Sequence, residues 1–106
     1  MAIARGNLYF GQLADAKADI YSPTSLDAMV HLIMLHNTNT TAEDVELLYH
    51  DGTSEYLFLN YEMAANETFL LQFRNEGFYV EDAGKITGNT TTASKVTIKI
   101  DGSTEA

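Results

Sequence analysis

Polar and apolar residues alternate along much of this chain with a period of two. The alternation is clearest in residues 94–101, where Val96, Ile98 and Ile100 stand between lysines and threonines. Residues 67–73 and 43–50 repeat the pattern. A period of two places successive side chains on opposite faces of a β-strand. Each segment is therefore a predicted strand, and the positions expected inside the fold are Val45, Leu47, Phe69, Leu71, Val96 and Ile98.

Turn residues separate these segments at short intervals. Asp51-Gly52 stands between two apolar runs and predicts a hairpin turn in which both residues have positive φ. The remaining chain divides into about eight short strand segments, which is typical of a sandwich or barrel. We expect one all-β domain over residues 1–106, an antiparallel, jelly-roll-like sandwich with strands at 7–12, 18–22, 27–36, 43–50, 54–60, 67–73, 77–87 and 94–101.

Residues 27–36 form an apolar run with little alternation. Good helix formers in this run leave a helix as an alternative, but the β pattern around it favours a strand. Such a strand is apolar on both faces, which a sheet with one face in water does not require. The second face then lies either inside the monomer or against a neighbouring subunit. In the latter case Val30, Leu32 and Met34 belong to an oligomer or capsid interface.

The first 16 residues have two interpretations. They carry Tyr9, Phe10 and Leu13 beside small, flexible residues. Chain termini are often poorly ordered unless another element binds them. Residues 1–16 are therefore either an extended arm that docks on a neighbouring protein through these three side chains, or the first strand of the same domain.

Charge and composition limit the classes of partner that the chain is expected to bind. The chain of 106 residues has six basic and fifteen acidic residues, a formal charge of −9, and no cysteine. Phosphate backbones and anionic lipids attract lysine and arginine, so we expect neither nucleic acid nor a membrane as partner. Without cysteine, disulfides, thiolate metal sites and thiol nucleophiles are excluded.

No residue pattern indicates catalysis or a cofactor. His31 and His36 are five residues apart, so a regular strand places them on opposite faces, where they cannot share a metal ion. A Gly-x-Ser-x-Gly nucleophile elbow does not occur. The acidic loop Glu81-Asp82-Ala83-Gly84 leaves calcium as a minor alternative, and the aromatic residues leave sugar stacking as another. We expect no enzymatic activity, no metal and no cofactor.

Several short motifs follow one another in an order that resembles a known group of proteins. From about Leu8 to Gly102, the chain resembles the small β-sandwich virion proteins encoded in the structural-gene clusters of tailed bacteriophages. The motifs are Ile20-Tyr21-Ser22-Pro23, Leu35-His36-Asn37-Thr38, Val45-Glu46-Leu47-Leu48-Tyr49-His50-Asp51-Gly52, Gly84-Lys85-Ile86-Thr87-Gly88 and Ser94-Lys95-Val96-Thr97-Ile98-Lys99-Ile100-Asp101-Gly102.

This resemblance implies a structural role in a virus particle. The first expectation is a capsid decoration (cement) protein that stabilises the head from outside and is made in the bacterial host cytoplasm. Its partners would be copies of itself, with a trimer as first guess, and the major capsid protein or other virion proteins. A neck or tail adaptor and a carbohydrate-binding β-sandwich module are the alternatives. The resemblance carries no catalytic residues.

Overall fold

The computed structural model describes residues 3–23, 26–73 and 77–105, with the side chains of residues 3–5 excluded. Within these ranges the chain forms nine strands and no helix. Accordingly, the described ranges contain no helix that could span a membrane. The strands are β1 (Ile3–Gln12), β2 (Ala18–Tyr21), β3 (Asp27–Asn37), β4 (Glu43–His50), β5 (Glu55–Met63), β6 (Thr68–Gln72), β7 (Phe78–Val80), β8 (Lys85–Thr90) and β9 (Val96–Glu105).

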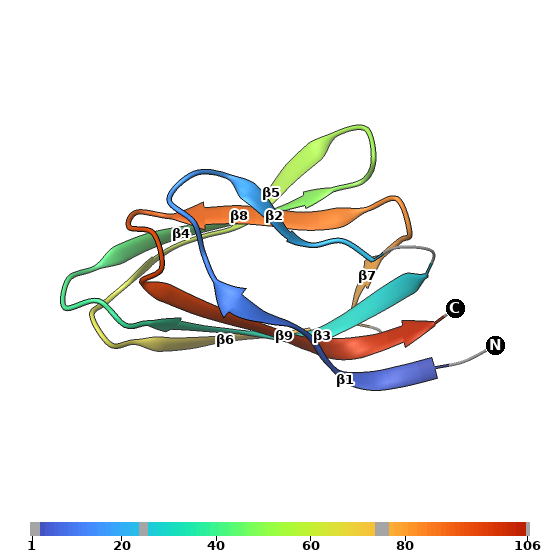
Figure 1. Ribbon diagram of the computed structural model, residues 1–106, viewed down its shortest axis with the longest axis horizontal. Helices are drawn as coiled ribbons and strands as arrows, with labels where there is room; N and C mark the ends of the chain where they lie inside the picture. The colour runs from blue at the N-terminus through green and yellow to red at the C-terminus, as the bar shows by residue number, and fades with distance from the viewer. Residues whose placement is uncertain (1–2, 24–25, 74–76, 106) are drawn as a thin grey trace.

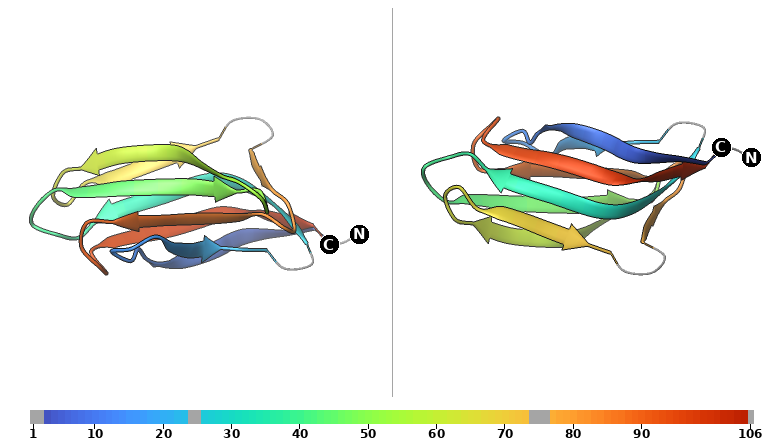
Figure 2. Two further views of the ribbon diagram at one scale, coloured as in Figure 1. Left: turned by 90° about the horizontal axis from the view of Figure 1, so that it is seen from above. Right: turned by 90° about the horizontal axis from the view of Figure 1, so that it is seen from below.

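Two antiparallel sheets pack face to face as a sandwich (Figure 1). One sheet has the order β1-β9-β3-β6, with β7 also paired to β3, and the other has the order β2-β8-β4-β5. Figure 2 shows the second sheet from above and the first from below. The predicted all-β sandwich is confirmed.

The strand order is that of a jelly roll. Strands pair from the two ends of the chain inward: β1 with β9, β2 with β8, β3 with β6 and β7, and β4 with β5. β6 and β7 lie along the same side of β3, one after the other, so together they take the place of one strand. Eight strand positions in two sheets with this nested pairing define the jelly roll.

The core lies between the two sheets, as the alternation predicts. Val45, Leu47, Val96 and Ile98 are fully buried. The other two predicted core residues, Phe69 and Leu71, are partly buried and pack against that cluster. Each pairs with a buried residue of β3, so both face inward from an edge strand.

β3 is a strand, as predicted for residues 27–36, but its alternation changes phase at a β-bulge. Ala28 and Val30 are buried before the bulge, and Ile33 and Leu35 after it. The bulge leaves His31 as an extra, exposed residue between Val30 and Leu32. A bulge inserts one residue and resets which face later residues occupy. This explains why the sequence shows no simple period of two here.

The hairpin at Asp51-Gly52 is present, but the predicted turn type is wrong. Strand β4 ends at His50 and β5 begins at Glu55, so the loop has four residues. Gly52 has a φ of 100°, whereas Asp51 is not among the non-glycine residues with positive φ. Instead, Asp51 Oδ1 accepts hydrogen bonds from the amides of Thr53 (2.9 Å) and Ser54 (2.7 Å). The aspartate side chain therefore closes a wider turn.

Residues 88–90, which lie between the predicted strands 77–87 and 94–101, are part of a strand. β8 continues to Thr90 and pairs with β4 throughout. Gly88 allows this pairing, because a Cβ there would lie 2.4 Å from the carbonyl oxygen of Glu46. Glycine inside a strand often marks such a close approach of two backbones.

Candidate interaction face

The solvent-facing side of the β1-β9-β3-β6 sheet, which we call the outer face, carries apolar side chains in register. Cross-strand partners of an antiparallel pair lie on the same face. Phe10 is the partner of Lys99, Lys99 of Met34, and Met34 of Leu70. These four residues therefore form one row across four strands, with Leu32 in the next row on β3. The right panel of Figure 2 views this side of the sheet.

The two ends of the row are unusually exposed for their size. Phe10 is 62% exposed and Leu70 is 58% exposed. Met34 and Leu32 are partly buried. Lys99, in the middle, donates two hydrogen bonds to the carboxylate of Asp101, at 2.7 and 2.9 Å. The row therefore consists of apolar side chains around one ion pair, Lys99–Asp101, whose charges neutralise each other. Such a mixture is typical of surfaces that bind a partner reversibly.

The six residues predicted for an interface divide into two groups. Phe10, Leu32 and Met34 lie on the outer face. Leu13 and Val30 are 2% and 0% exposed in the core, and Tyr9 packs against that core, so these three offer little surface to a partner. The sequence did not distinguish them because the bulge in β3 and another in β1, between Asn7 and Tyr9, shift the alternation.

The N-terminal segment forms the first strand of the domain and not an extended arm. β1 pairs with β9 of the same chain from Ile3 to Gln12. Leu13 continues this pairing, since its amide donates to the carbonyl of Val96 at 2.9 Å. Met1 and Ala2, which the arm hypothesis included, lie outside the described residues.

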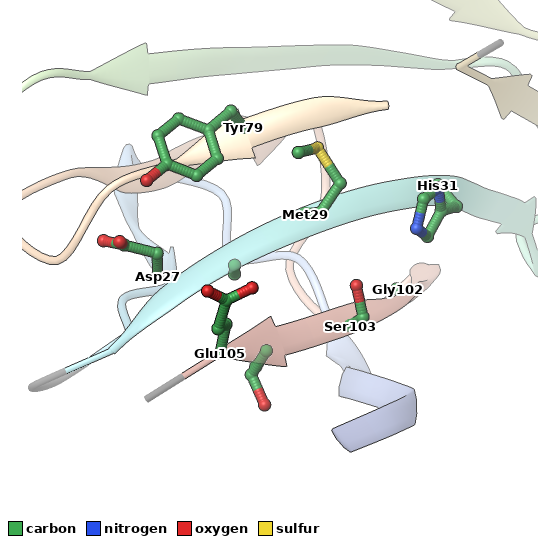
Figure 3. A pocket seen from close by; sticks show the side chains of 9 residues that line it. Asp27, Met29, His31, Tyr79, Gly102, Ser103 and Glu105 are labelled. Atoms are coloured by element: carbon green, nitrogen blue, oxygen red, sulfur yellow. The ribbon is translucent and has the colours of Figure 1, made fainter. Parts of the chain in front are cut away.

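A pocket of about 470 Å³ opens on the outer face across β3 and its two neighbours, β7 and β9; we call it the Tyr79 pocket. Its lining includes Asp27, Met29 and His31 from β3, Tyr79 from β7, and Ser103 and Glu105 from β9. Figure 3 shows these side chains around the opening, with the Tyr79 hydroxyl on the side of Asp27. Two register pairs, Asp27 with Glu105 and Met29 with Ser103, place their side chains on one face.

Carboxylates lie close to the Tyr79 hydroxyl. A hydrogen bond to Asp27, together with burial and the nearby charges of Asp27, Glu81 and Glu105, raises the pKa of the Tyr79 phenol. Asp27 Oδ1 also accepts a hydrogen bond from the amide of Asp82 at 2.9 Å. The carboxylate of Asp27 is thus held in place by two donors, while its charge is not cancelled by them.

His31 and His36 do not lie on opposite faces, contrary to the sequence prediction. His36 belongs to the outer face, where its Nδ1 is 2.7 Å from the Thr68 hydroxyl. His31, displaced by the bulge, lines the Tyr79 pocket on the same side of the sheet. Among the described residues, no group of three or more histidines or carboxylates is placed to hold a metal ion.

The outer side of the opposite sheet differs in character. Its pocket, of about 580 Å³, is lined by Asp15, Asp44 and Glu46 with amide and hydroxyl groups. Of the two exposed apolar residues on β5, Leu57 pairs with Leu48 on this outer side, whereas Tyr56 pairs with Tyr49, which packs against the core. The side chain of Lys17 forms an ion pair with Glu55, which also accepts a hydrogen bond from Thr87 at 2.8 Å. This surface is mainly polar, so the exposed apolar row distinguishes the outer face.

Sequence reasoning missed Leu70, Tyr79, Asp27 and Glu105. Leu70 was detectable, since it occupies a solvent-facing position in the alternation of residues 67–73. The proximity of Asp27 and Glu105 was not detectable from the sequence, because it depends on the pairing of β3 with β9, which are far apart in the chain.

Comparison with known proteins gives no relative from which a function could be transferred. No protein-family model, curated protein sequence or solved structure matches this chain.

Proposed function

We propose that this chain is a non-enzymatic structural subunit of a bacteriophage particle, a decoration protein that attaches to the outside of the capsid through its outer face. The observation that carries the proposal is the in-register row of Phe10, Met34 and Leu70 on one side of a β-sandwich, with Phe10 and Leu70 exposed at its two ends. The motif order in the sequence, which resembles small phage virion proteins, supplies the biological setting.

The chemistry of this row suits attachment to a preformed shell. Burial of exposed apolar side chains at a contact is favourable, by roughly 25 cal/mol per Å² of apolar area removed from water. The Lys99–Asp101 ion pair keeps the face soluble before it binds. A net charge of −9 favours a position outside the shell, away from packaged DNA.

Self-association is part of the proposal, with a trimer as the first expectation. Repeated subunits on a capsid surface contact one another as well as the shell, and exposed apolar patches on small domains usually mark such contacts. Light scattering across a concentration series measures the mass directly. A monomeric mass at all concentrations would mean that the subunits do not associate in solution and can assemble only on the capsid surface.

The test is co-sedimentation with particles. The genes that flank its own are first examined for capsid and tail proteins, and the purified protein is then mixed with empty heads, and separately with tails, assembled from those proteins. We expect saturable binding to heads and loss of binding in a Phe10→Ser, Leu70→Ser double variant. The matched control is Tyr56→Ser with Leu57→Ser, which removes two apolar residues of similar exposure, 56% and 52%, from the opposite sheet.

Each outcome has a defined meaning. Binding to tails and not to heads would replace decoration by the adaptor alternative. Binding to neither, by a protein with an intact melting transition, would overturn the proposed function.

A further inference from the structure

The Tyr79 pocket combines two carboxylates, those of Asp27 and Glu105, with the apolar side chain of Met29 and the ring of Tyr79. Asp27 and Glu105 are direct cross-strand partners, so their Cα atoms lie about 5 Å apart on one face of the sheet. Of the side chains that the structure describes, none that lines this pocket is a lysine or arginine. The described ion pairs use Lys17, Lys85 and Lys99 elsewhere on the surface.

The rest of the pocket is suited to an organic group and not to a bare ion. Met29 and the ring of Tyr79 are cross-strand partners and line the same opening. Tyr79 is 47% exposed, so part of its side chain remains accessible to a ligand. A guanidinium group stacks on aromatic rings and pairs with carboxylates through parallel N–H donors.

The pocket is also continuous with the row of apolar side chains. Met29 and Leu32 lie on the same strand and on the same face, on either side of the bulge at His31. A protein segment that covers Leu32 and Met34 is therefore placed to insert a side chain into the Tyr79 pocket.

We propose that the Tyr79 pocket binds the guanidinium group of an arginine from the capsid protein, between the carboxylates of Asp27 and Glu105 and against the ring of Tyr79. This inference rests on the proposed function, since it names the partner chemistry of the same face. Charge complementarity selects a basic segment over a second copy of this chain, which itself carries a formal charge of −9.

The first experiment needs no partner protein. The ¹⁵N-labelled chain is titrated with N-acetyl-arginine amide and followed by NMR, with the neutral isostere N-acetyl-citrulline amide as the matched ligand. We expect saturable shifts at the amides of Met29, Tyr79 and Ser103 with arginine only. Because the ion pairs are partly exposed, the dissociation constant should lie in the millimolar range.

Two variants with the same change in charge separate the pocket from general attraction to an acidic protein. Asp27→Asn with Glu105→Gln should weaken arginine binding about tenfold. Asp44→Asn with Glu46→Gln, in the acidic pocket of the opposite sheet, should leave it unchanged. Equal loss in both variants, or equal shifts with citrulline, would overturn the proposal.

Two other occupants are tested in parallel. The first is Arg5 of the same chain, which is the register partner of Ser103. If an Arg5→Ala variant binds arginine and the unmodified chain does not, the chain fills its own pocket. Saturable shifts with methyl β-glucoside in place of arginine would identify a sugar site instead. Either result rejects the partner arginine.

Co-sedimentation then distinguishes failure of this inference from failure of the proposed function. If heads bind the unmodified protein and the Asp27→Asn, Glu105→Gln variant equally well, the decoration role stands and the arginine pocket is rejected. If heads bind neither while NMR still shows the arginine site, the pocket stands and the decoration role is rejected.

Discussion

The side-chain amide of Asn39 donates a hydrogen bond to Oε2 of Glu43 at 3.0 Å, and that carboxylate is buried inside the sandwich. Its other oxygen, Oε1, accepts hydrogen bonds from the Thr92 amide (2.7 Å) and the Thr90 hydroxyl (3.1 Å). Glu43 thus connects the start of β4 to the end of β8 and to two loops. A buried carboxylate is tolerated only where donors surround it.

Glu43→Gln should lower the free energy of unfolding by about 1–3 kcal/mol, because the amide that replaces one carboxylate oxygen cannot accept a hydrogen bond. Urea unfolding followed by tyrosine fluorescence measures the change. Glu46→Gln, on the same strand but facing outward, is the control and should stay within about 0.5 kcal/mol. Equal stability of the two variants would show that the Glu43 interactions contribute no more than a surface carboxylate does.

The same site predicts a pH dependence. Burial alone raises the pKa of Glu43, but the hydrogen bonds from Thr92, Asn39 and Thr90 outweigh it and hold the pKa below its ordinary value. A group with a depressed pKa in the folded state stabilises the fold above its unfolded pKa and loses that contribution as the pH falls through its folded pKa. The stability difference between the unmodified protein and Glu43→Gln should therefore be largest near pH 7 and shrink as the pH falls below about 4.

Tyr9 and Phe10 provide a direct comparison of core and surface. Tyr9 packs against the core from the inner side of β1, whereas Phe10 is 62% exposed on the outer face. Tyr9→Ala should cost about 1–3 kcal/mol of stability and Phe10→Ala less than about 0.5 kcal/mol. Thermal melting of the two single variants is the measurement. A large loss from Phe10→Ala would mean that this side chain stabilises the monomer and is not held for a partner.

Most of the sandwich follows from short-range patterns. Alternation in residues 43–50 and 94–101 identified strands whose inward residues, among them Val45 and Ile98, are fully buried. The errors arose where a single residue changes the register of a strand or the type of a turn. The bulge at His31 altered the face of later residues, and the side-chain hydrogen bonds of Asp51 replaced the expected turn.

The candidate site was less accessible to sequence reasoning. The apolar residues of strand 27–36 suggested a second contact face, and Leu32 and Met34 do lie outward. The Tyr79 pocket could not be predicted, because its walls come from β3, β7 and β9, and their order in the sheet depends on long-range pairing. Local patterns determine which face a residue occupies and not which distant strand lies beside it.

Gly102 should be one of the least replaceable residues in the sheet. It lies in β9 opposite Val30 of β3, and a Cβ at this position would be 2.0 Å from the carbonyl oxygen of Met29. That oxygen belongs to the backbone, so a rotamer change cannot relieve the contact. Gly102→Ala should therefore separate β9 from β3 locally and cost about 2 kcal/mol or more, as overpacking of a tight core does.

The neighbouring Ser103→Ala is the control, because Ser103 faces outward and an alanine there meets no new contact. It should change stability by less than about 0.5 kcal/mol. Hydrogen exchange at the amides of β3 and β9 localises the effect: Gly102→Ala should accelerate exchange at both strands around the bulge, while β4 and β8 in the other sheet keep their protection. If hydrogen exchange and the melting temperature are both unchanged, β3 and β9 can move apart at this point without loss of stability. The close approach of Gly102 to Met29 would then not be a constraint on the fold.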